Sequence, residues 1–229
     1  MKGMALAAVA ITCGSHAAPA PAAKADVALA PVAQGALCVT HGQIDTSSGH
    51  LKIRAPSVRA VAVGSAGDDA LLSFTYVGPT GEVKALASGD VRRQIGLKLR
   101  AENGCNLLYV MWRIEPKAQI VVSLKRNPGA TTHRQCGTRG YRNLVARAGT
   151  QPPALGPNLE HRLHAKLDGR ILRVWADRGL AWEGDVGDET LALRGPAGVR
   201  SDNGRFDVEL DTRAAKAPLA GSPLSDDED

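Results

Sequence analysis

The chain of 229 residues is poor in aromatic side chains, since phenylalanine, tyrosine and tryptophan together make up only 3% of it. Proteins that bind single-stranded nucleic acid stack the bases on several exposed rings along a basic groove. This sequence has few aromatic side chains that could serve for such stacking. We therefore expect no nucleic acid partner, even though the chain is basic, with a formal net charge of +5 at pH 7.

The apolar run near the N-terminus is too short to cross a bilayer, which takes about 20 residues. A lysine at position 2 followed by a short apolar run is typical of a bacterial export signal. Residues 1–17 are therefore predicted to direct the protein to the periplasm or the cell surface. One interpretation is cleavage by a signal peptidase near Ala17, because small residues stand at the required spacing in Ser15-His16-Ala17.

A second interpretation is that this N-terminus resembles that of a bacterial lipoprotein. In such proteins the cysteine after the apolar run, here Cys13, is acylated and anchors the protein to a membrane. Residues 18–36 are rich in alanine and proline and would then form a flexible tether. Ala10-Ile11-Thr12 departs from the usual residues before the lipidated cysteine, so both interpretations stay open. A lipid anchor is the one membrane contact that we expect.

Cysteine is also rare, with four residues in the chain. An exported domain meets an oxidising compartment, which favours a disulfide. We predict a bond between Cys105 and Cys136, which stand beside glycines and bracket two predicted strands; Cys38 is the alternative partner for either. No second cysteine or histidine recurs at ligand spacing near them. A zinc site is therefore not expected.

Several signatures of catalysis and cofactor binding are missing. The sequence has no Gly-x-Ser-x-Gly elbow and no phosphate-binding loop. His161 and His164 lie three residues apart, so on a strand they point to opposite faces and form neither a dyad nor a joint metal site. The acidic loop 185–189 is the one place for a structural calcium ion, but it lacks the spaced ligands of a dedicated site. We expect no metal and no cofactor.

No amphipathic helix of useful length is present, whereas alternating apolar and polar residues recur between turn signals. This pattern predicts about ten or eleven short strands in an all-β, antiparallel two-sheet β-sandwich. A single domain is expected over residues 37–213, followed by a disordered acidic tail over residues 214–229. The predicted strands are 37–40, 49–55, 71–77, 94–100, 107–115, 119–125 and four or five more after residue 157.

The late strands carry the most specific pattern. Apolar residues alternate from Leu163 to Asp177, a short strand contains Trp182, and a glycine-rich stretch over residues 195–203 reads as a turn before the last strand. Over residues 159–211 this resembles the concanavalin A-like, laminin-G-like jelly roll of lectins, glycosidase-associated domains and thrombospondin-type modules. The resemblance implies carbohydrate or surface-ligand binding at the level of the fold, and nothing about catalysis.

Charge and carboxylates give weaker indications. Residues 37–213 contain 19 arginines and 6 lysines against 18 acidic residues. This excess of positive charge suits anionic partners such as acidic glycans or lipid phosphates, although arginines spread over strands also form ordinary solvated faces.

A glycosidase needs two facing carboxylates. Asp207, Glu209 and Asp211 share the outward face of the last strand, so Glu115 beside Trp112 is the better candidate for a groove carboxylate.

The loop over residues 125–143 is our candidate for ligand binding, because guanidinium groups, amides, hydroxyls and one aromatic ring recognise sugar hydroxyls and carboxylates. The alternative is that the loop is purely structural and held in place by the disulfide.

For the function, we predict non-catalytic binding of a glycan or another cell-envelope component. The alternatives are a glycoside hydrolase or lyase of this fold, and a structural interaction module of the envelope. The candidate ligand-binding residues are Trp112, Glu115, Arg126, Asn127, His133, Arg139, Tyr141 and Arg142.

Overall fold

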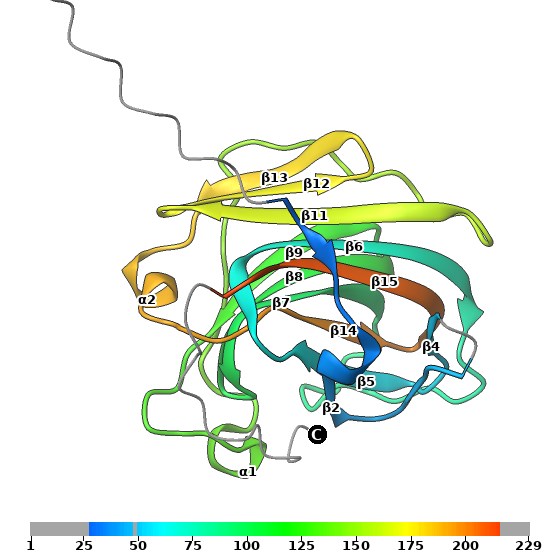
Figure 1. Cartoon of the computed structure of the whole chain (residues 1–229), viewed down its shortest axis with the longest axis horizontal. Helices are drawn as coiled ribbons and strands as arrows, with labels where there is room; N and C mark the ends of the chain where they lie inside the picture. Colours follow the sequence, from blue (N-terminus) through cyan, green and yellow to red (C-terminus); the bar gives the residue numbers. More distant parts are fainter. Residues whose placement is uncertain (1–27, 48–49, 216–229) are drawn as a thin grey trace, which may run out of the picture.

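The computed structural model describes residues 28–47 and 50–215, which form two antiparallel sheets packed face to face (Figure 1). The predicted export signal, its cleavage site and Cys13 lie outside the described residues, as does most of the predicted acidic tail. Two stacked antiparallel sheets confirm the predicted all-β sandwich. Within the described ranges, no helix is long and apolar enough to cross a membrane.

The first sheet has eight strands in the order β13-β12-β11-β6-β15-β4-β3, with β1 also paired to β15. Its longest pairing joins β6 to β15, and β11 extends it on the other side of β6. Its members are β1 (Ala30–Pro31), β3 (Ile44–Asp45), β4 (Leu51–Ile53), β6 (Ser65–Pro79), β11 (Glu160–Asp168), β12 (Ile171–Ala176), β13 (Gly179–Asp185) and β15 (Gly204–Ala214).

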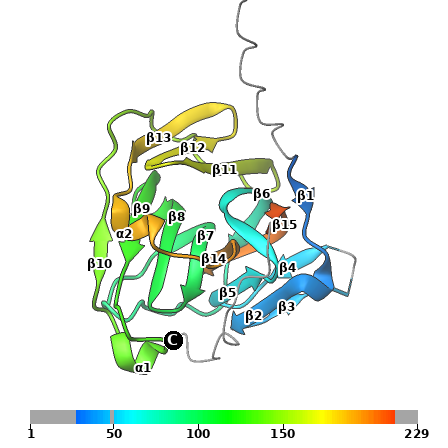
Figure 2. The same cartoon turned by 60° about the vertical axis from the view of Figure 1, so that its left-hand side comes forward.

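The second sheet has seven strands in the order β10-β9-β8-β7-β14-β5-β2. The predicted strand 107–115 is β8, and it lies inside the sheet because it pairs with β7 on one side and β9 on the other. Figure 2 shows β10 at the outer edge of this sheet, with α1 below it. Its members are β2 (Leu37–His41), β5 (Ser57–Ala62), β7 (Arg93–Asn103), β8 (Asn106–Glu115), β9 (Gln119–Lys125), β10 (Tyr141–Asn143) and β14 (Gly198–Asp202).

The core lies between the two sheets and is built from alternate side chains of each strand. Phe74 of β6 meets Trp112 of β8 edge to face, with ring centroids 5.7 Å apart, and meets Phe206 of β15 at 6.0 Å. All three rings are buried. Full burial of one such side chain stabilises the folded state by about 1.5–3 kcal/mol, so these rings help to hold the sheets together.

The stretch predicted as a turn over residues 195–203 is largely a strand, and this prediction was wrong. Residues 198–202 form β14, which lies between β5 and β7 in the second sheet. The glycines here allow close packing rather than a turn: a Cβ on Gly198 would lie 2.2 Å from the Ala60 carbonyl oxygen. The turn itself is confined to Asn203, whose φ of 55° leads into β15.

The elements outside the sheets are short. They are the 3-10 turn η1 (Gln34–Ala36) and two four-residue helices, α1 (His133–Cys136) and α2 (Asp188–Leu191). The predicted disulfide between Cys105 and Cys136 is confirmed, and it ties α1 to the turn between β7 and β8. Cys38 is a free cysteine on β2. The loop after β9 is therefore fixed at its middle to the body of the second sheet.

Candidate functional site

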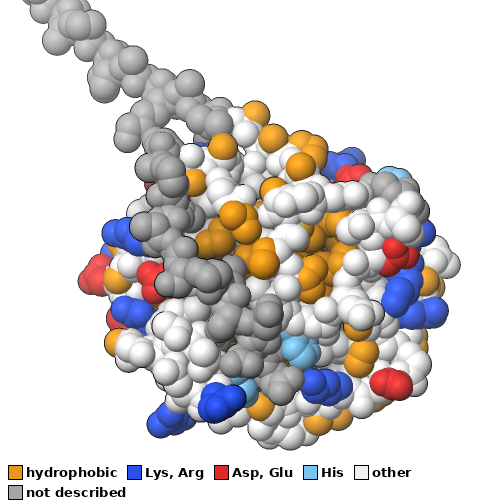
Figure 3. Space-filling view, turned by 60° about the horizontal axis from the view of Figure 1, so that its bottom comes forward, with side chains coloured by type: hydrophobic (Ala, Val, Ile, Leu, Met, Phe, Trp, Pro, Cys, Tyr) orange, Lys and Arg blue, Asp and Glu red, His pale blue; other side chains and the backbone are white. Residues whose placement is uncertain are grey.

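A groove of about 490 Å³ runs over the outer face of the seven-stranded sheet. One wall is the segment 84–92, and the other is formed by α1, the residues after it and β10. Figure 3 shows the face at the bottom of the Figure 1 view: hydrophobic side chains gather near its centre, and lysines and arginines lie around its edge. Ligand pockets are commonly of this volume, and the groove is the candidate site.

The floor of the groove carries a buried polar network centred on Asp202. The strand register places Arg200 opposite Arg59 of β5 and Asp202 opposite Gln94 of β7. Arg59 Nη2 donates a hydrogen bond to Asp202 Oδ1 at 2.8 Å, and Arg200 Nε donates to Oδ2 at 3.0 Å. Gln94 Nε2 donates to the same Oδ2 at 2.6 Å. Every member is less than a tenth exposed.

The charges of this network hold Asp202 in its ionised form. Burial alone raises the pKa of Asp202, but the positive charges of Arg200 and Arg59 outweigh burial and lower it to about 2. Burial likewise lowers the pKa of Arg200, but the carboxylate of Asp202 outweighs it and raises that pKa above its usual value. Two guanidinium groups therefore share one carboxylate, which leaves an excess positive charge on the floor of the groove.

A pair of tyrosines lies beside this network. The rings of Tyr109 and Tyr141 stack with centroids 6.1 Å apart and an interplanar angle of 17°. The Arg200 guanidinium lies 4.7 Å from the Tyr109 centroid, and the Lys125 ammonium lies 5.0 Å from that of Tyr141. Burial raises the pKa of Tyr141, but Arg200 and Lys125 outweigh it and lower that pKa below its usual value. Tyr109 is buried and Tyr141 is 45% exposed, so Tyr141 is the accessible ring of the pair, and it lies beside cations.

Gly96 makes the contact between Arg200 and Tyr109 geometrically feasible. Arg200 is on β14 and Tyr109 on β8, and β7 runs between them. The β7 residue opposite Arg200 is Gly96, so no side chain there stands in the path of the guanidinium. A Cβ at this position would lie 2.1 Å from the carbonyl oxygen of Val110. Glycine is therefore required both for strand packing and for the aromatic–cation contact.

The wall over residues 84–92 is fixed to the floor by Asn203. The Asn203 side-chain amide donates to the carbonyl oxygens of Lys84 at 2.8 Å and Arg92 at 2.9 Å, and its own oxygen accepts from the Lys84 backbone N–H at 2.8 Å. These three bonds bind both ends of the segment to the residue that follows β14. A wall held in this way is preorganised for binding.

The opposite wall is fixed by the disulfide and by Asn106. The Asn106 amide donates to the Ala130 carbonyl oxygen at 2.8 Å, and its oxygen accepts from Arg126 and from the Asn127 backbone N–H, both at 2.9 Å. Lys125 Nζ donates to the carbonyl oxygen of Gly104 at 2.8 Å. Although the loop is irregular, its backbone is held to the β7–β8 turn at several points.

Two of the eight residues predicted to bind ligand line the groove, namely His133 and Tyr141. The prediction for Trp112 is wrong, because its side chain is 0% exposed and packs between the sheets against Phe74 and His161. Side chains along a strand alternate between its faces. On β8 the groove receives residues 109, 111 and 113, whereas Trp112 belongs to the other set.

The remaining five predicted residues lie outside the lining of the groove and have other contacts. Glu115 accepts a hydrogen bond from Arg93 Nη1 at 2.5 Å, and Arg142 pairs with Glu189 at 2.6 Å. Arg126 and Asn127 organise the loop through its hydrogen bonds, as Asn127 Nδ2 also donates to the carbonyl oxygens of Cys105 and Arg139. Arg139 itself donates to the carbonyl oxygens of Gln135 and Cys136. These residues shape the wall rather than the binding surface.

The loop 185–189 is occupied by ion pairs. Asp185 pairs with Arg170 at 3.2 Å and with Arg147 at 3.4 Å, and Asp188 pairs with Arg170 at 3.1 Å. In the part of the chain that the structure describes, no three His, Cys, Asp or Glu side chains are grouped so that they suit a metal ion.

The two histidines of β11 point to opposite faces of their strand, as predicted. His161 lies toward the core, with its ring 5.9 Å from that of Phe74 and 5.6 Å from that of Trp112. His164 is on the other face, where Nε2 lies 2.8 Å from Asp69. The two rings therefore form no joint site.

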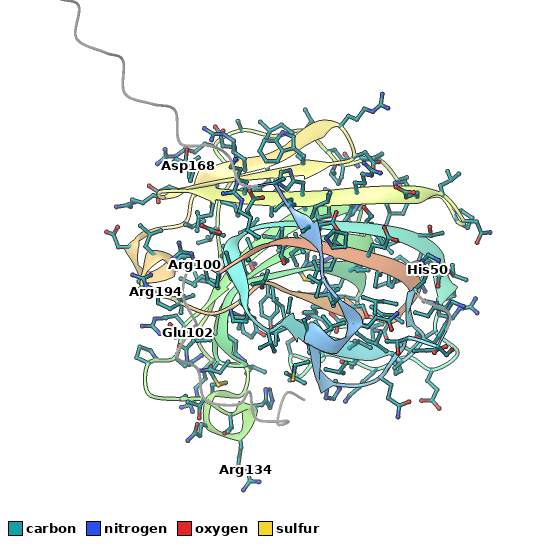
Figure 4. The ribbon with its side chains drawn as sticks, in the orientation of Figure 1. His50, Arg100, Glu102, Arg134, Asp168 and Arg194 are labelled. Atoms are coloured by element: carbon teal, nitrogen blue, oxygen red, sulfur yellow. A yellow bond between two sulfur atoms is a disulfide. The ribbon has the colours of Figure 1, made fainter. Side chains whose placement is uncertain are left out.

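A second group of charges lies at one edge of the sandwich, where Figure 4 labels Arg100, Glu102 and Arg194 close together. The backbone N–H of Arg194 donates to Glu102 Oε1 at 2.9 Å. Arg100 Nη1 donates to the carbonyl oxygens of Leu191 and Leu193, both at 3.1 Å. These contacts fasten the region around α2 to β7. They give this edge a structural role.

The sequence reasoning missed most of the groove floor. Arg59, Gln94, Arg200 and Asp202 come from three strands that are far apart in the sequence. The one local signal was Arg200-Ser-Asp202, in which two opposite charges stand two residues apart and so share a strand face. Residues 195–203 were predicted to form a turn, so Arg200 and Asp202 were not expected to share a strand face.

Comparison with known proteins agrees with this architecture. No protein-family model matches the sequence, and no curated protein is significantly similar to it. Among solved structures, the carbohydrate binding module CBM66 from Bacillus subtilis is similar with 10% identity and a TM-score of 0.53, over 78% of this chain and 93% of that one. A putative glycosyl hydrolase from Parabacteroides distasonis is also similar, with 9% identity and a TM-score of 0.48, over 80% of this chain and 89% of that one. At 10% identity the likeness to CBM66 shows the fold alone: the chain has the concanavalin A-like sandwich fold that the late strands predicted.

Proposed function

We propose that this protein binds a glycan in the groove of the seven-stranded sheet and does not cleave it. The observation that carries the proposal is the tyrosine pair set beside the buried network of Asp202 on one hollow surface that is partly polar and partly apolar. Sugars present apolar ring faces and a fringe of hydroxyl groups. Stacked rings suit the first, and fixed amides, hydroxyls and guanidinium groups suit the second.

Further lining residues fit the same ligand. The Ser123 hydroxyl donates a hydrogen bond to Asn143 Oδ1 at 2.7 Å, and the strand register places Ser123 between Tyr109 of β8 and Asn143 of β10. Met111 and Val121 add apolar surface to the middle of the groove. A flat apolar patch would favour a protein partner instead, whereas this surface is hollow and mixed. The similarity to CBM66 also supports the proposal, because CBM66 is a carbohydrate binding module and 93% of its chain is matched by this fold.

The carboxylates of the groove argue against hydrolysis. Glycosidases need one carboxyl group held protonated and a second one facing it. Among the described residues that line the groove, the carboxylates are Asp90 and Asp202. Asp202 is ionised and bound on both oxygens. Asp90 pairs with Arg92 at 2.6 Å on the wall. Neither suits a general acid.

We also propose that the protein acts outside the cytoplasm, at the cell envelope. The disulfide between Cys105 and Cys136 supports this location, since such bonds persist in oxidising compartments. The mass of the mature protein from its native host tests the proposal. Loss of residues 1–17, or a lipid on Cys13, would support export. An intact, unmodified N-terminus would contradict it.

The test of glycan binding is a screen of the full chain on a glycan array, followed by calorimetric titration of the saccharides that bind. Tyr141→Ala is expected to weaken binding by about fivefold to fiftyfold, because it removes the exposed ring of the stacked pair. Val145→Ala is the matched control, since Val145 is 85% exposed and does not line the groove. Shortened saccharides in the mixture, or an array on which nothing binds, would contradict the proposal.

A further inference from the structure

The lining of the groove has a marked excess of positive charge. Six lysines and arginines line the groove together with two aspartates, so the lining itself carries four more positive than negative charges. Four of the cations belong to the floor and the tyrosine pair or lie beside them, and two belong to the wall over residues 84–92. Because a concave surface of low dielectric focuses such a field, the groove attracts anions more strongly than the net charge of the chain suggests. The six are Arg59, Lys84, Arg92, Arg113, Lys125 and Arg200.

Arg113 differs from the other arginines of the groove, because it forms no ion pair with a carboxylate of the described residues, although the charge of Asp90 acts on it from farther away. Arg59 and Arg200 share Asp202, and Arg92 pairs with Asp90. Arg113 is half-buried, and its Nε is a buried donor without a hydrogen-bond partner. Burial, and then the nearby charge of Arg92, lower the pKa of Arg113 below its usual value. A half-buried charge with an unsatisfied donor is unfavourable, and an anion bound at this point would relieve it.

The position of Arg113 relative to the tyrosines sets the size of the ligand. Tyr109 and Arg113 lie four residues apart on β8 and face the same way, so their Cα atoms are about 13 Å apart along the strand. Met111 lies between them on the same face. A single pyranose ring does not span this length. The groove therefore suits an oligosaccharide that stacks on the tyrosine pair at one end and reaches Arg113 at the other.

We infer that the groove takes an anionic oligosaccharide, whose carboxylate or sulfate group binds the Arg113 guanidinium while a neighbouring ring stacks on Tyr141. This inference rests on the proposed glycan binding. The wall cations Lys84 and Arg92 strengthen the attraction from the side. A planar guanidinium matches a carboxylate with two parallel hydrogen bonds, which makes a uronate the natural occupant, and a sulfate group satisfies the same donors.

The experiment is calorimetric titration of the full chain with three saccharides of equal length. Tetragalacturonate carries carboxylates, a heparin tetrasaccharide carries sulfates as well, and maltotetraose is neutral. We expect the better anionic ligand to bind at least about tenfold more tightly than maltotetraose, with affinity falling as the salt concentration rises from about 0.05 M to 0.5 M. The ratio of the two anionic affinities shows which group the site prefers.

Two charge-removing variants locate the contact. Arg113→Gln is expected to weaken binding of the anionic ligand by about tenfold to a hundredfold, and to leave the affinity for neutral saccharides unchanged. Arg134→Gln is the matched control, because Arg134 is on α1 in one wall of the groove but does not line it and points away from the body of the molecule (Figure 4). It should change affinity by less than about twofold. Thermal unfolding confirms that both variants fold.

Lys84→Gln provides a second test that does not threaten the fold, since Lys84 is exposed on the wall. It should weaken anion binding and reduce its dependence on salt. Equal affinity for neutral and anionic saccharides, or full anion affinity in folded Arg113→Gln, would overturn the inference while leaving glycan binding intact. If no saccharide of either kind binds, the proposed function itself fails.

Discussion

Arg59 and Arg200 lie directly opposite one another on β5 and β14, and both guanidinium groups bind the carboxylate of Asp202. Like charges placed opposite each other on a sheet normally repel. Here the shared carboxylate holds them together, and Gln94 donates a third hydrogen bond to it. The floor of the groove is therefore rigid before any ligand arrives, and Arg200 is held where it faces Tyr109.

Replacing Asp202 with asparagine is expected to destabilise the protein by about 3–5 kcal/mol, because it leaves two buried guanidinium groups without a counter-charge. Urea unfolding of the two proteins measures the difference. Asp207→Asn is the matched control, since Asp207 pairs with Arg54 at the surface, and the loss there should stay below about 1 kcal/mol. Equal effects of the two substitutions would show that the network contributes no more than a surface pair.

The stability that Asp202 contributes is expected to depend on acid pH. The pKa of Asp202 is lowered to about 2 in the folded protein by Arg200 and Arg59, which overcome burial, whereas in the unfolded chain it is about 3.9. A lowered folded pKa adds stability above the unfolded pKa, and this is lost as the pH falls through the folded pKa. The gap in stability between wild type and Asp202→Asn should therefore be full above about pH 5 and shrink toward pH 2. A gap that is constant over this range would contradict the assignment.

Removing the disulfide through Cys105→Ser and Cys136→Ser is expected to cost about 3–4 kcal/mol of stability, because the bond closes a loop with a sequence separation of 31 residues. Binding should weaken as well, since α1 and the residues after it form one wall of the groove. Thermal unfolding and calorimetric titration measure the two effects. Cys38→Ser is the control, and it should change neither, because Cys38 takes no part in the bond.

The acidic run over residues 226–229 has the charge that the groove attracts. Truncation after residue 215 removes these four acidic residues and one lysine. We expect it to raise the affinity for an anionic saccharide by about twofold to tenfold at low salt, with the difference vanishing at high salt. Affinity for a neutral saccharide should stay the same. An equal gain for both ligands would mean that the tail acts by blocking space rather than through charge.

Much of the fold was readable from the sequence because strand alternation is a local signal. The runs that became β6, β7, β8 and β9 were found, although the structure extends β6 at both ends. The error at β14 has a physical cause. Gly198 permits close approach to Ala60 of the neighbouring strand, and a glycine used for packing looks the same in a sequence as a glycine used for a turn.

The site was less predictable, because its residues come together only through the order of the strands. The run 107–115 is apolar on both faces, so its sequence does not show which residues face the core. Trp112 was assigned to the ligand and lies in the core, whereas Tyr109 and Arg113 face the groove. The disulfide was predicted correctly, and the predicted residue Tyr141 lies in the lining of the groove, because cysteine spacing and a lone aromatic in a polar loop are local signals. Arg59 and Asp202 are 143 residues apart in the sequence, so no local signal predicts that they pair.

Amide hydrogen exchange of the full chain, with and without saturating tetragalacturonate, tests the central claim most directly because it locates the bound saccharide. The account predicts slower exchange in β8, β9, β10 and residues 84–92, with no change in β11, β12 and β13 of the other sheet. Protection confined to that other sheet, or none at saturation, would contradict the claim that the groove of the seven-stranded sheet is the binding site.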